Sequence, residues 1–151
     1  MLKIKRIGLI AHDACKQHMI QWVEFNAQRL AKHKLICTGT TGRMVQELYD
    51  KKYPQLKVVV KRLKSGPLGG DQQMGSLIAS GELDILIFFT DPMTTQPHDV
   101  DVKALIRLST IANIVVGCTR SSADFIISSE LFDGDYNAIE NNYESYVKRE
   151  V

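Results

Sequence analysis

The chain has 151 residues, 44% of them hydrophobic and 24% charged, and its formal net charge at pH 7 is +2. This length and ordinary globular composition predict a single domain over residues 1–151 with a substantial hydrophobic core. Because the net charge is small and the basic residues are scattered, a nucleic-acid partner is not expected.

In the first half of the chain, apolar runs alternate with segments of helical periodicity. Residues 4–11 are apolar with β-branched members, which is typical of a buried parallel strand. In the next segment Ile20, Val23 and Leu30 recur at helical spacing. The expected elements are a strand over 4–11, a helix from 14 to about 32, a strand over 35–37, a helix from 43 to about 51 and a strand over 58–60.

The second half continues this alternation. Asp84–Phe89 is the most strand-like segment of the chain, and Gly81 before it is typical of a helix C-terminus. The tail that contains Tyr136 carries no clear fold signal. The expected elements are a helix over 72–80, a strand over 84–89, a helix from about 102 to 112, a strand over 114–116 and a short helix after 124.

The sequence suggests no disulfide framework, membrane span or targeting segment. Cys15, Cys37 and Cys118 form no Cys-x-x-Cys pair, and the chain runs into a strand almost at once. No apolar stretch approaches the length of a membrane span, so a membrane partner is not expected. A cytoplasmic location is the expectation.

Five alternations of strand and helix predict the fold class. We expect a three-layer α/β sandwich with a mostly parallel, doubly wound sheet of about five strands. In such sheets ligands bind outside the carboxyl ends of the strands. Polar and titratable residues follow those ends in this chain, namely His12 and Asp13, Thr38–Gly42, Ser65–Asp71, and then Asp91, His98 and Asp101.

The loop Ser65–Gln73 contains three glycines and a proline, so the backbone must turn between a strand and a helix. Free N–H groups at such a helix start favour an anion. Asp71 lies at this turn, where it is either a helix N-cap or a base beside a phosphorylated substrate. Thr38–Gly42 is similarly either a capping turn or a phosphate site, and Lys16 either points to that rim or is solvated.

Two of the four histidines follow predicted strands. His12 and His98 can polarise a carbonyl or carry a proton in the neutral imidazole form. A rival interpretation adds Asp13, Asp99 and Asp101 as metal ligands, although no histidine pair has helical His-x-x-x-His spacing. A metal site is therefore not predicted.

Five blocks together resemble the methylglyoxal synthase family over roughly residues 6–130. The resemblance implies the α/β sandwich of that family and conversion of dihydroxyacetone phosphate to methylglyoxal and inorganic phosphate, with neither a metal nor an organic cofactor. The blocks are Ala11–Lys16, Thr38–Gly42, Ser65–Gln73, Phe88–Pro92 and Pro97–Leu105.

The same resemblance implies roles for individual residues. Asp71 corresponds to the base that takes the carbon-bound proton, His98 to its partner at the substrate oxygens, and Asp101 to the residue that orients His98. The implied substrate-binding set is His12, Asp13, Lys16, Thr38, Thr40, Thr41, Ser65, Gly66 and Asp91.

The resemblance also implies a homohexamer that inorganic phosphate inhibits, with Arg149 as a loose counterpart of a family arginine directed at a neighbouring subunit. The chief alternative function is a non-catalytic module of the same fold that binds a phosphorylated metabolite. A flavodoxin-like nucleotide-binding protein is disfavoured, because the chain lacks a phosphate-loop lysine and a dinucleotide fingerprint.

Overall fold

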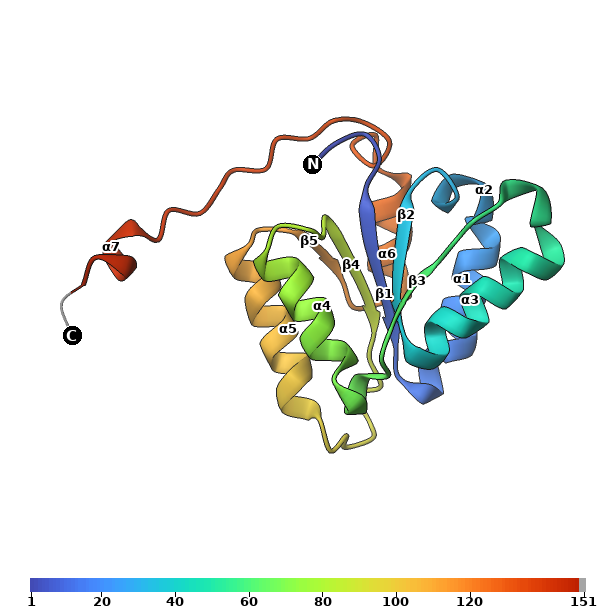
Figure 1. Ribbon diagram of the computed structural model, residues 1–151, viewed down its shortest axis with the longest axis horizontal. Coiled ribbons are helices and arrows are strands. Elements are labelled where there is room, and N and C mark those ends of the chain that lie inside the picture. The colour runs from blue at the N-terminus through green and yellow to red at the C-terminus, as the bar shows by residue number, and fades with distance from the viewer. Residues whose placement is uncertain (150–151) are drawn as a thin grey trace.

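The computed structural model describes residues 1–149 and contains one five-stranded parallel sheet (Figure 1). The strand order is β3-β2-β1-β4-β5, so the order reverses beside β1. The predicted fold class, a doubly wound parallel sheet between two layers of helices, is confirmed. The strands are β1 (Arg6–Ala11), β2 (Lys34–Thr38), β3 (Lys61–Leu63), β4 (Ile85–Phe89) and β5 (Val115–Gly117).

Helices cover both faces of the sheet (Figure 1). One layer consists of α1 (Lys16–Phe25), α2 (Ala27–Leu30), α3 (Gly39–Lys52) and α6 (Arg120–Ser128), and the other of α4 (Gly70–Ala79) and α5 (Asp99–Ile111). Short helical turns are η1 (Asp13–Cys15), η2 (Pro54–Leu56), η3 (Gly66–Leu68) and α7 (Glu144–Val147). In residues 1–149 no helix combines the length and apolarity that a bilayer crossing requires.

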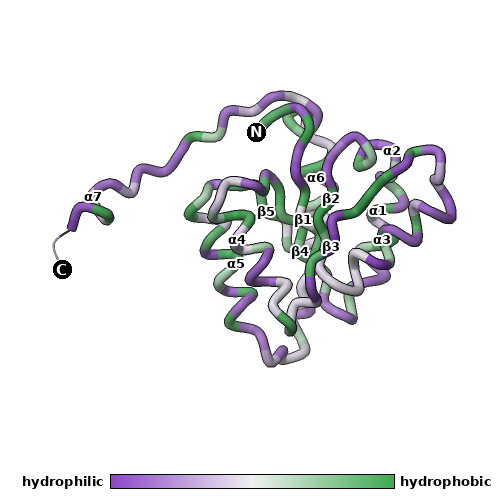
Figure 2. Tube along the Cα trace, in the orientation of Figure 1, coloured by the Kyte–Doolittle hydropathy of each residue, from purple (hydrophilic) through white to green (hydrophobic). Residues whose placement is uncertain are grey.

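The core lies on both sides of the sheet because the central strands are apolar on both faces. All five residues of β4 are buried, and the central strands β1 and β4 are mostly green, that is hydrophobic, in Figure 2. Two large polar-tipped side chains in the α1–α3 layer keep hydrogen-bond partners: Trp22 Nε1–H donates to Asp124 at 3.0 Å, and Tyr49 O–H donates to the Ala27 carbonyl at 3.0 Å. These contacts hold together the helices that pack on this face of the sheet.

The expected third strand, 58–60, is wrong by three residues. Strand β3 is Lys61–Leu63, which pairs with the end of β2. Before it, the Gln46 side chain donates to the Val58 carbonyl and accepts from the Val60 N–H, each at 2.9 Å. The backbone of residues 58–60, where the β-branched residues predicted a strand, therefore bonds to a side-chain amide from α3 instead of to a neighbouring strand.

Helix boundaries also differ from the expectations. The single helix expected to about residue 32 is interrupted at Asn26, whose side-chain amide donates to the Trp22 carbonyl at 2.8 Å. Helices α3 and α5 begin earlier than expected, at Gly39 and Asp99. The Thr/Gly turn is consequently the first turn of α3, with Thr38 at the N-cap position.

The turn from β2 into α3 packs backbone against backbone. Gly39 has φ +27°, and a Cβ there would lie 2.6 Å from the Cα of Ser65, which begins the Gly-rich loop. Its N–H also donates to the Lys64 carbonyl at 3.1 Å. Two loops that carry predicted site residues are thereby joined directly.

We expect Gly39→Ala to lower the free energy of unfolding by about 3 kcal/mol or more. The alanine would be strained at a positive φ, and its Cβ would clash with the backbone of Ser65. Gly81→Ala is the matched control, because Gly81 has φ +69° but no atom within 4 Å of the added Cβ. That control should lose only about 1 kcal/mol. Urea denaturation of both variants measures the difference, and equal losses would remove the packing argument.

The amino ends of the strands are covered by the two terminal segments (Figure 1). Met1 and Tyr136 exchange two hydrogen bonds of 2.8 and 3.0 Å. Lys5 is only 1% exposed, and its ammonium donates to the carbonyls of Leu2 and Gly134. The opposite, carboxyl edge of the sheet is free of these segments.

Candidate active site

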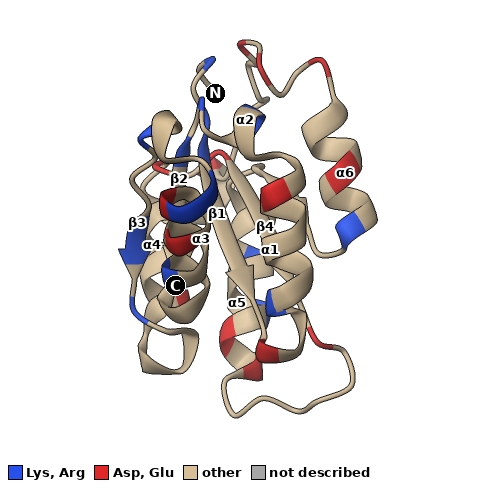
Figure 3. Cartoon of the chain, turned by 90° about the vertical axis from the view of Figure 1, so that its right-hand side faces the viewer, with Lys and Arg blue, Asp and Glu red and all other residues tan. Residues whose placement is uncertain are grey.

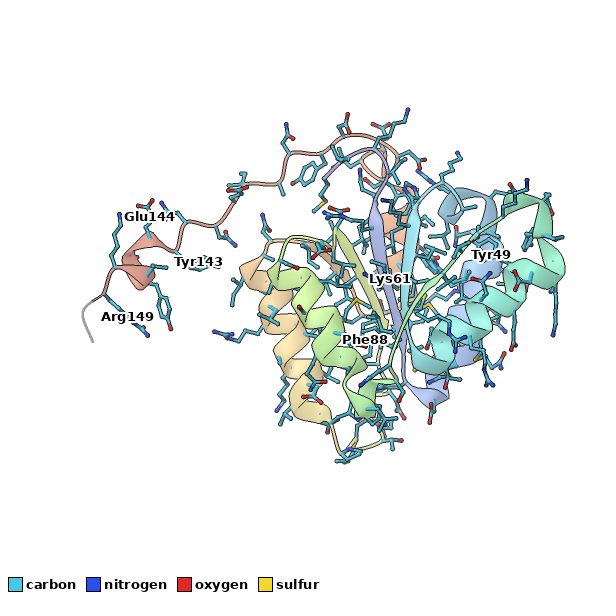
Figure 4. All side chains as sticks on the ribbon, in the orientation of Figure 1. Tyr49, Lys61, Phe88, Tyr143, Glu144 and Arg149 are labelled. Carbon is cyan, nitrogen blue, oxygen red and sulfur yellow. The ribbon has the colours of Figure 1, made fainter. Side chains whose placement is uncertain are left out.

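A polar cavity of about 80 Å³ lies at the carboxyl edge of the sheet. It opens beside β1, where the strand order reverses, which is the usual ligand position in doubly wound sheets. Phe88 from β4 forms part of its wall (Figure 4). The lining residues are Ile10, His12, Asp13, Thr38, Gly66, Pro67, Asp71, Phe88, Gln96 and His98.

Asp71 is a buried carboxylate without a hydrogen-bond partner. It is 2% exposed, and both oxygens lack partners. It lies within the first turn of α4, Gly69 holds the N-cap position, and Asp71 caps nothing. Burial raises its pKa above the ordinary aspartate value; His98 opposes this rise, and the negative charge of Asp101 adds to it by a smaller amount. An unpartnered carboxylate of raised basicity is suited to accept a proton.

Gly66 permits the close approach of the Gly-rich loop to this carboxylate. A Cβ on Gly66 would lie 3.1 Å from both oxygens of Asp71. Any larger residue would push against the carboxylate or fill the cavity beside it. The glycine therefore keeps the face of Asp71 open toward the cavity.

His98 stands next to Asp71 at the start of α5. Its Nε2 lies 3.7 Å from Asp71 Oδ2, and its Nδ1 is buried without a partner. The His98 ring meets the His12 ring edge-on, with centroids 5.9 Å apart. A small molecule between these groups would touch one carboxylate and two imidazoles.

His12 is held in one tautomer. Its Nδ1 accepts the backbone N–H of Asp91 at 3.0 Å, so the neutral ring carries its hydrogen on Nε2. That Nε2 is buried without a partner. Burial and the neighbouring His98 lower the pKa of His12, which keeps the ring neutral near pH 7. His12 thus offers an N–H donor to the cavity.

The two other predicted acids do not line the cavity. The Asp91 carboxylate accepts the N–H groups of Met93 at 2.9 Å and Thr94 at 3.3 Å and so forms a turn. Asp101 lies in the first turn of α5 and shares a separate groove with Asp71 between α4 and α5. Acidic residues are drawn red in Figure 3. Its backbone N–H, not its carboxylate, contacts the His98 carbonyl.

The α3 N-terminus supplies neutral donors beside the cavity. Thr38 and Thr41 are buried, and Thr38 makes no side-chain capping bond, so its hydroxyl is free for a ligand. Thr40 follows in the same turn. The first amide of the helix already donates to the Lys64 carbonyl. The next two amides belong to the first turn, where N–H groups have no partner within the helix.

Lys16 is the cation next to the cavity wall. Its ammonium donates to the Ala11 carbonyl at 3.0 Å and to Asp13 at 2.6 Å. The Asp13 side chain is fully exposed, so a stronger anion can compete for Lys16. Ser65 lies next to Gly66 but, like Lys16, Thr40 and Thr41, does not itself form the wall.

Among the residues described, no three His, Cys, Asp or Glu side chains gather closely enough to hold a metal ion. The metal-ligand set considered above is therefore not assembled. The structure instead adds Gln96, a polar residue that the sequence did not single out, to the cavity wall. The position of Gln96, two residues before His98 in the same loop, was the available signal.

Comparison with known proteins agrees with this geometry. A family model described as an MGS-like domain matches residues 18–119. Methylglyoxal synthase of Maridesulfovibrio salexigens is 45% identical over the whole of both chains, and that of Coxiella burnetii is 43% identical over 98% of this chain and 99% of the relative. A crystal structure of methylglyoxal synthase from Elizabethkingia anophelis superposes with a TM-score of 0.89 at 48% identity, covering 100% of this chain and 95% of the other. The chain therefore belongs to the methylglyoxal synthase family.

Proposed function

We propose that the protein is a carbon–oxygen lyase that converts dihydroxyacetone phosphate to methylglyoxal and inorganic phosphate, using neither metal nor organic cofactor. The observation that carries the proposal is the buried, unpartnered Asp71 carboxylate that faces His98 across a small polar cavity. A binding module would gain nothing from such a group, because an unpaired buried carboxylate costs stability.

In the first step Asp71 removes a proton from the hydroxymethyl carbon of the substrate. The C–H electrons form an enediolate, and the charge develops on the neighbouring carbonyl oxygen. The Nε2–H of His12, with an N–H of His98, donates to that oxygen. His98 can also move a proton between the two substrate oxygens.

In the second step the hydroxyl oxygen on the deprotonated carbon gives up its hydrogen through His98 to the central oxygen and becomes the aldehyde carbonyl. The carbon–carbon double bond shifts toward the carbon that bears the phosphate, and the bond between that carbon and the bridging phosphate oxygen breaks. Phosphate leaves into the seat formed by the α3 N-terminus, Thr38 and Gly66, with Lys16 nearby. The proton on Asp71 passes to phosphate or water. The remaining enol takes a proton at its methylene carbon, loses its hydroxyl proton and becomes methylglyoxal, which balances the reaction.

The remaining assignments extend this proposal. Inorganic phosphate, as the leaving group, should compete for the same seat and inhibit. We further propose that residues 1–151 act as one domain, that six copies assemble, and that the protein works in the cytoplasm on triose phosphate. Light scattering of the purified protein measures the mass of the assembly.

The decisive test incubates the purified protein with dihydroxyacetone phosphate and follows phosphate and methylglyoxal together. Equal amounts of both products, formed at a rate proportional to protein, are expected. Binding of the substrate without release of either product would favour the regulatory module instead. Release of phosphate without methylglyoxal would indicate a phosphatase.

A further inference from the structure

Gln96 is the one polar side chain of the cavity wall to which neither the sequence nor the mechanism gives a role. Its backbone is fixed from three directions. The Gln96 N–H donates to Asp99 Oδ1 at 3.1 Å, the Asp99 N–H returns a bond to the Gln96 carbonyl at 3.2 Å, and Pro97 restricts the preceding residue to extended conformations. Gln96 therefore lines the cavity from a backbone that is already held in place.

The amide group of Gln96 makes no hydrogen bond to any residue within 1–149. An amide offers two donors and one acceptor, so it can both give a hydrogen bond to a hydroxyl oxygen and accept that hydroxyl's hydrogen. It also carries no charge. Beside Asp13 and Asp71, which line the same cavity, it can contact a polar ligand group without adding repulsion.

The walls of the cavity indicate which substrate group Gln96 reaches. The phosphate seat is formed by Thr38, the last residue of β2, and Gly66, which follows β3. Gln96 and His98 come from the loop after β4, on the other side of β1 in the sheet. When the phosphate of the triose lies beside Thr38 and Gly66, the opposite, hydroxymethyl end of the triose points toward Gln96 and His98.

We propose that Gln96 is a specificity-determining residue that hydrogen-bonds the free hydroxyl of the triose. This inference rests on the proposed function. A site that pairs a substrate hydroxyl discriminates against an analogue that lacks it, because its own polar group is then left unpaired. Gln96 consequently selects dihydroxyacetone phosphate over its deoxy analogue, hydroxyacetone phosphate.

The test compares the wild type with Gln96→Met, which keeps the length of the side chain and removes the amide. The KM for dihydroxyacetone phosphate should rise roughly five- to ten-fold, as expected for one neutral hydrogen bond. The inhibition constants of hydroxyacetone phosphate and of inorganic phosphate should stay within about two-fold, because neither ligand carries the hydroxyl. Gln28→Met, an exposed position on α2, is the control and should change none of these constants.

Loss of affinity for all three ligands together would place Gln96 at the phosphate and overturn the inference, as would three unchanged constants. Gln96→Ala serves as a second variant if circular dichroism finds Gln96→Met misfolded. A wild-type protein that releases no phosphate defeats the proposed function itself. An active wild type with unaltered discrimination in the variants defeats the role of Gln96 alone.

Discussion

Asp71→Asn should fold, bind inorganic phosphate within about three-fold of the wild type and lose kcat by about 10³-fold or more. Asparagine has nearly the same shape, but its amide cannot accept a proton from carbon. Because the carboxylate touches no other side chain by a hydrogen bond, its replacement should not disturb the phosphate seat. Steady-state kinetics with dihydroxyacetone phosphate and calorimetric titration with phosphate measure the two effects.

Asp50→Asn is the matched control, since Asp50 is exposed on α3 and only accepts from Gln46. It should keep wild-type kinetics. If Asp71→Asn turns over within ten-fold of the wild type, Asp71 is not the base. If instead phosphate binding disappears with activity, the variant reports a collapsed seat rather than lost proton transfer.

The same variant should also reveal the stability cost of this carboxylate. The folded-state pKa of Asp71 is raised by burial, so the ionised form is disfavoured in the folded protein. Its contribution to stability is therefore fully present below the ordinary aspartate pKa and is lost as pH rises through the raised value. We expect Asp71→Asn to be more stable than the wild type at pH 7 by about 1–3 kcal/mol, with the difference vanishing near pH 3.

Denaturant melts at several pH values measure this difference. A constant gap across the pH range would mean that folding does not raise the pKa of this carboxylate. The same linkage predicts that wild-type kcat/KM falls as the medium is acidified through the raised pKa, because a protonated Asp71 cannot act as a base.

The sequence was sufficient for the fold class, and it placed several polar residues at one edge of the sheet, because both depend on strong local signals. Buried parallel strands are apolar throughout, and the residues after them must meet at one edge. His12, Thr38, Gly66, Asp71 and His98 were predicted in this way, and all five line the cavity.

Features that depend on contacts between distant segments were not predictable from the chain alone. The start of β3 depends on hydrogen bonds from the side chain of Gln46, and the hydrophobic pattern of the sequence gives no sign of these bonds. The tautomer of His12 is set by a backbone amide 79 residues away in sequence. Asp91 and Asp101 were assigned to the site because they follow a predicted strand and because of the family resemblance. In the structure Asp91 forms a turn, and Asp101 acts on Asp71 through its charge.

His98→Asn should lower kcat by about 10²- to 10³-fold while the inhibition constant of phosphate changes less than about three-fold. The imidazole Nε2, 3.7 Å from Asp71 Oδ2, is the atom that asparagine cannot reproduce, because its amide is too short to reach that position. Phosphate affinity should persist, since the seat is built from the α3 N-terminus and the Gly-rich loop. Kinetics with phosphate as an inhibitor separate the two constants.

A longer amide then distinguishes the two tasks that His98 can perform. Glutamine can place an N–H near the position of Nε2 but cannot carry a proton from one oxygen to another. If His98→Gln regains most of the kcat lost in His98→Asn, the main task of His98 is donation of a hydrogen bond to the enediolate. If the kcat of His98→Gln is as low as that of His98→Asn, the main task is movement of a proton between the substrate oxygens. His18→Asn, exposed on α1, should match the wild type. A His98→Asn variant with normal kcat and weakened phosphate inhibition would make His98 a phosphate ligand and leave His12 as the sole donor to the enediolate.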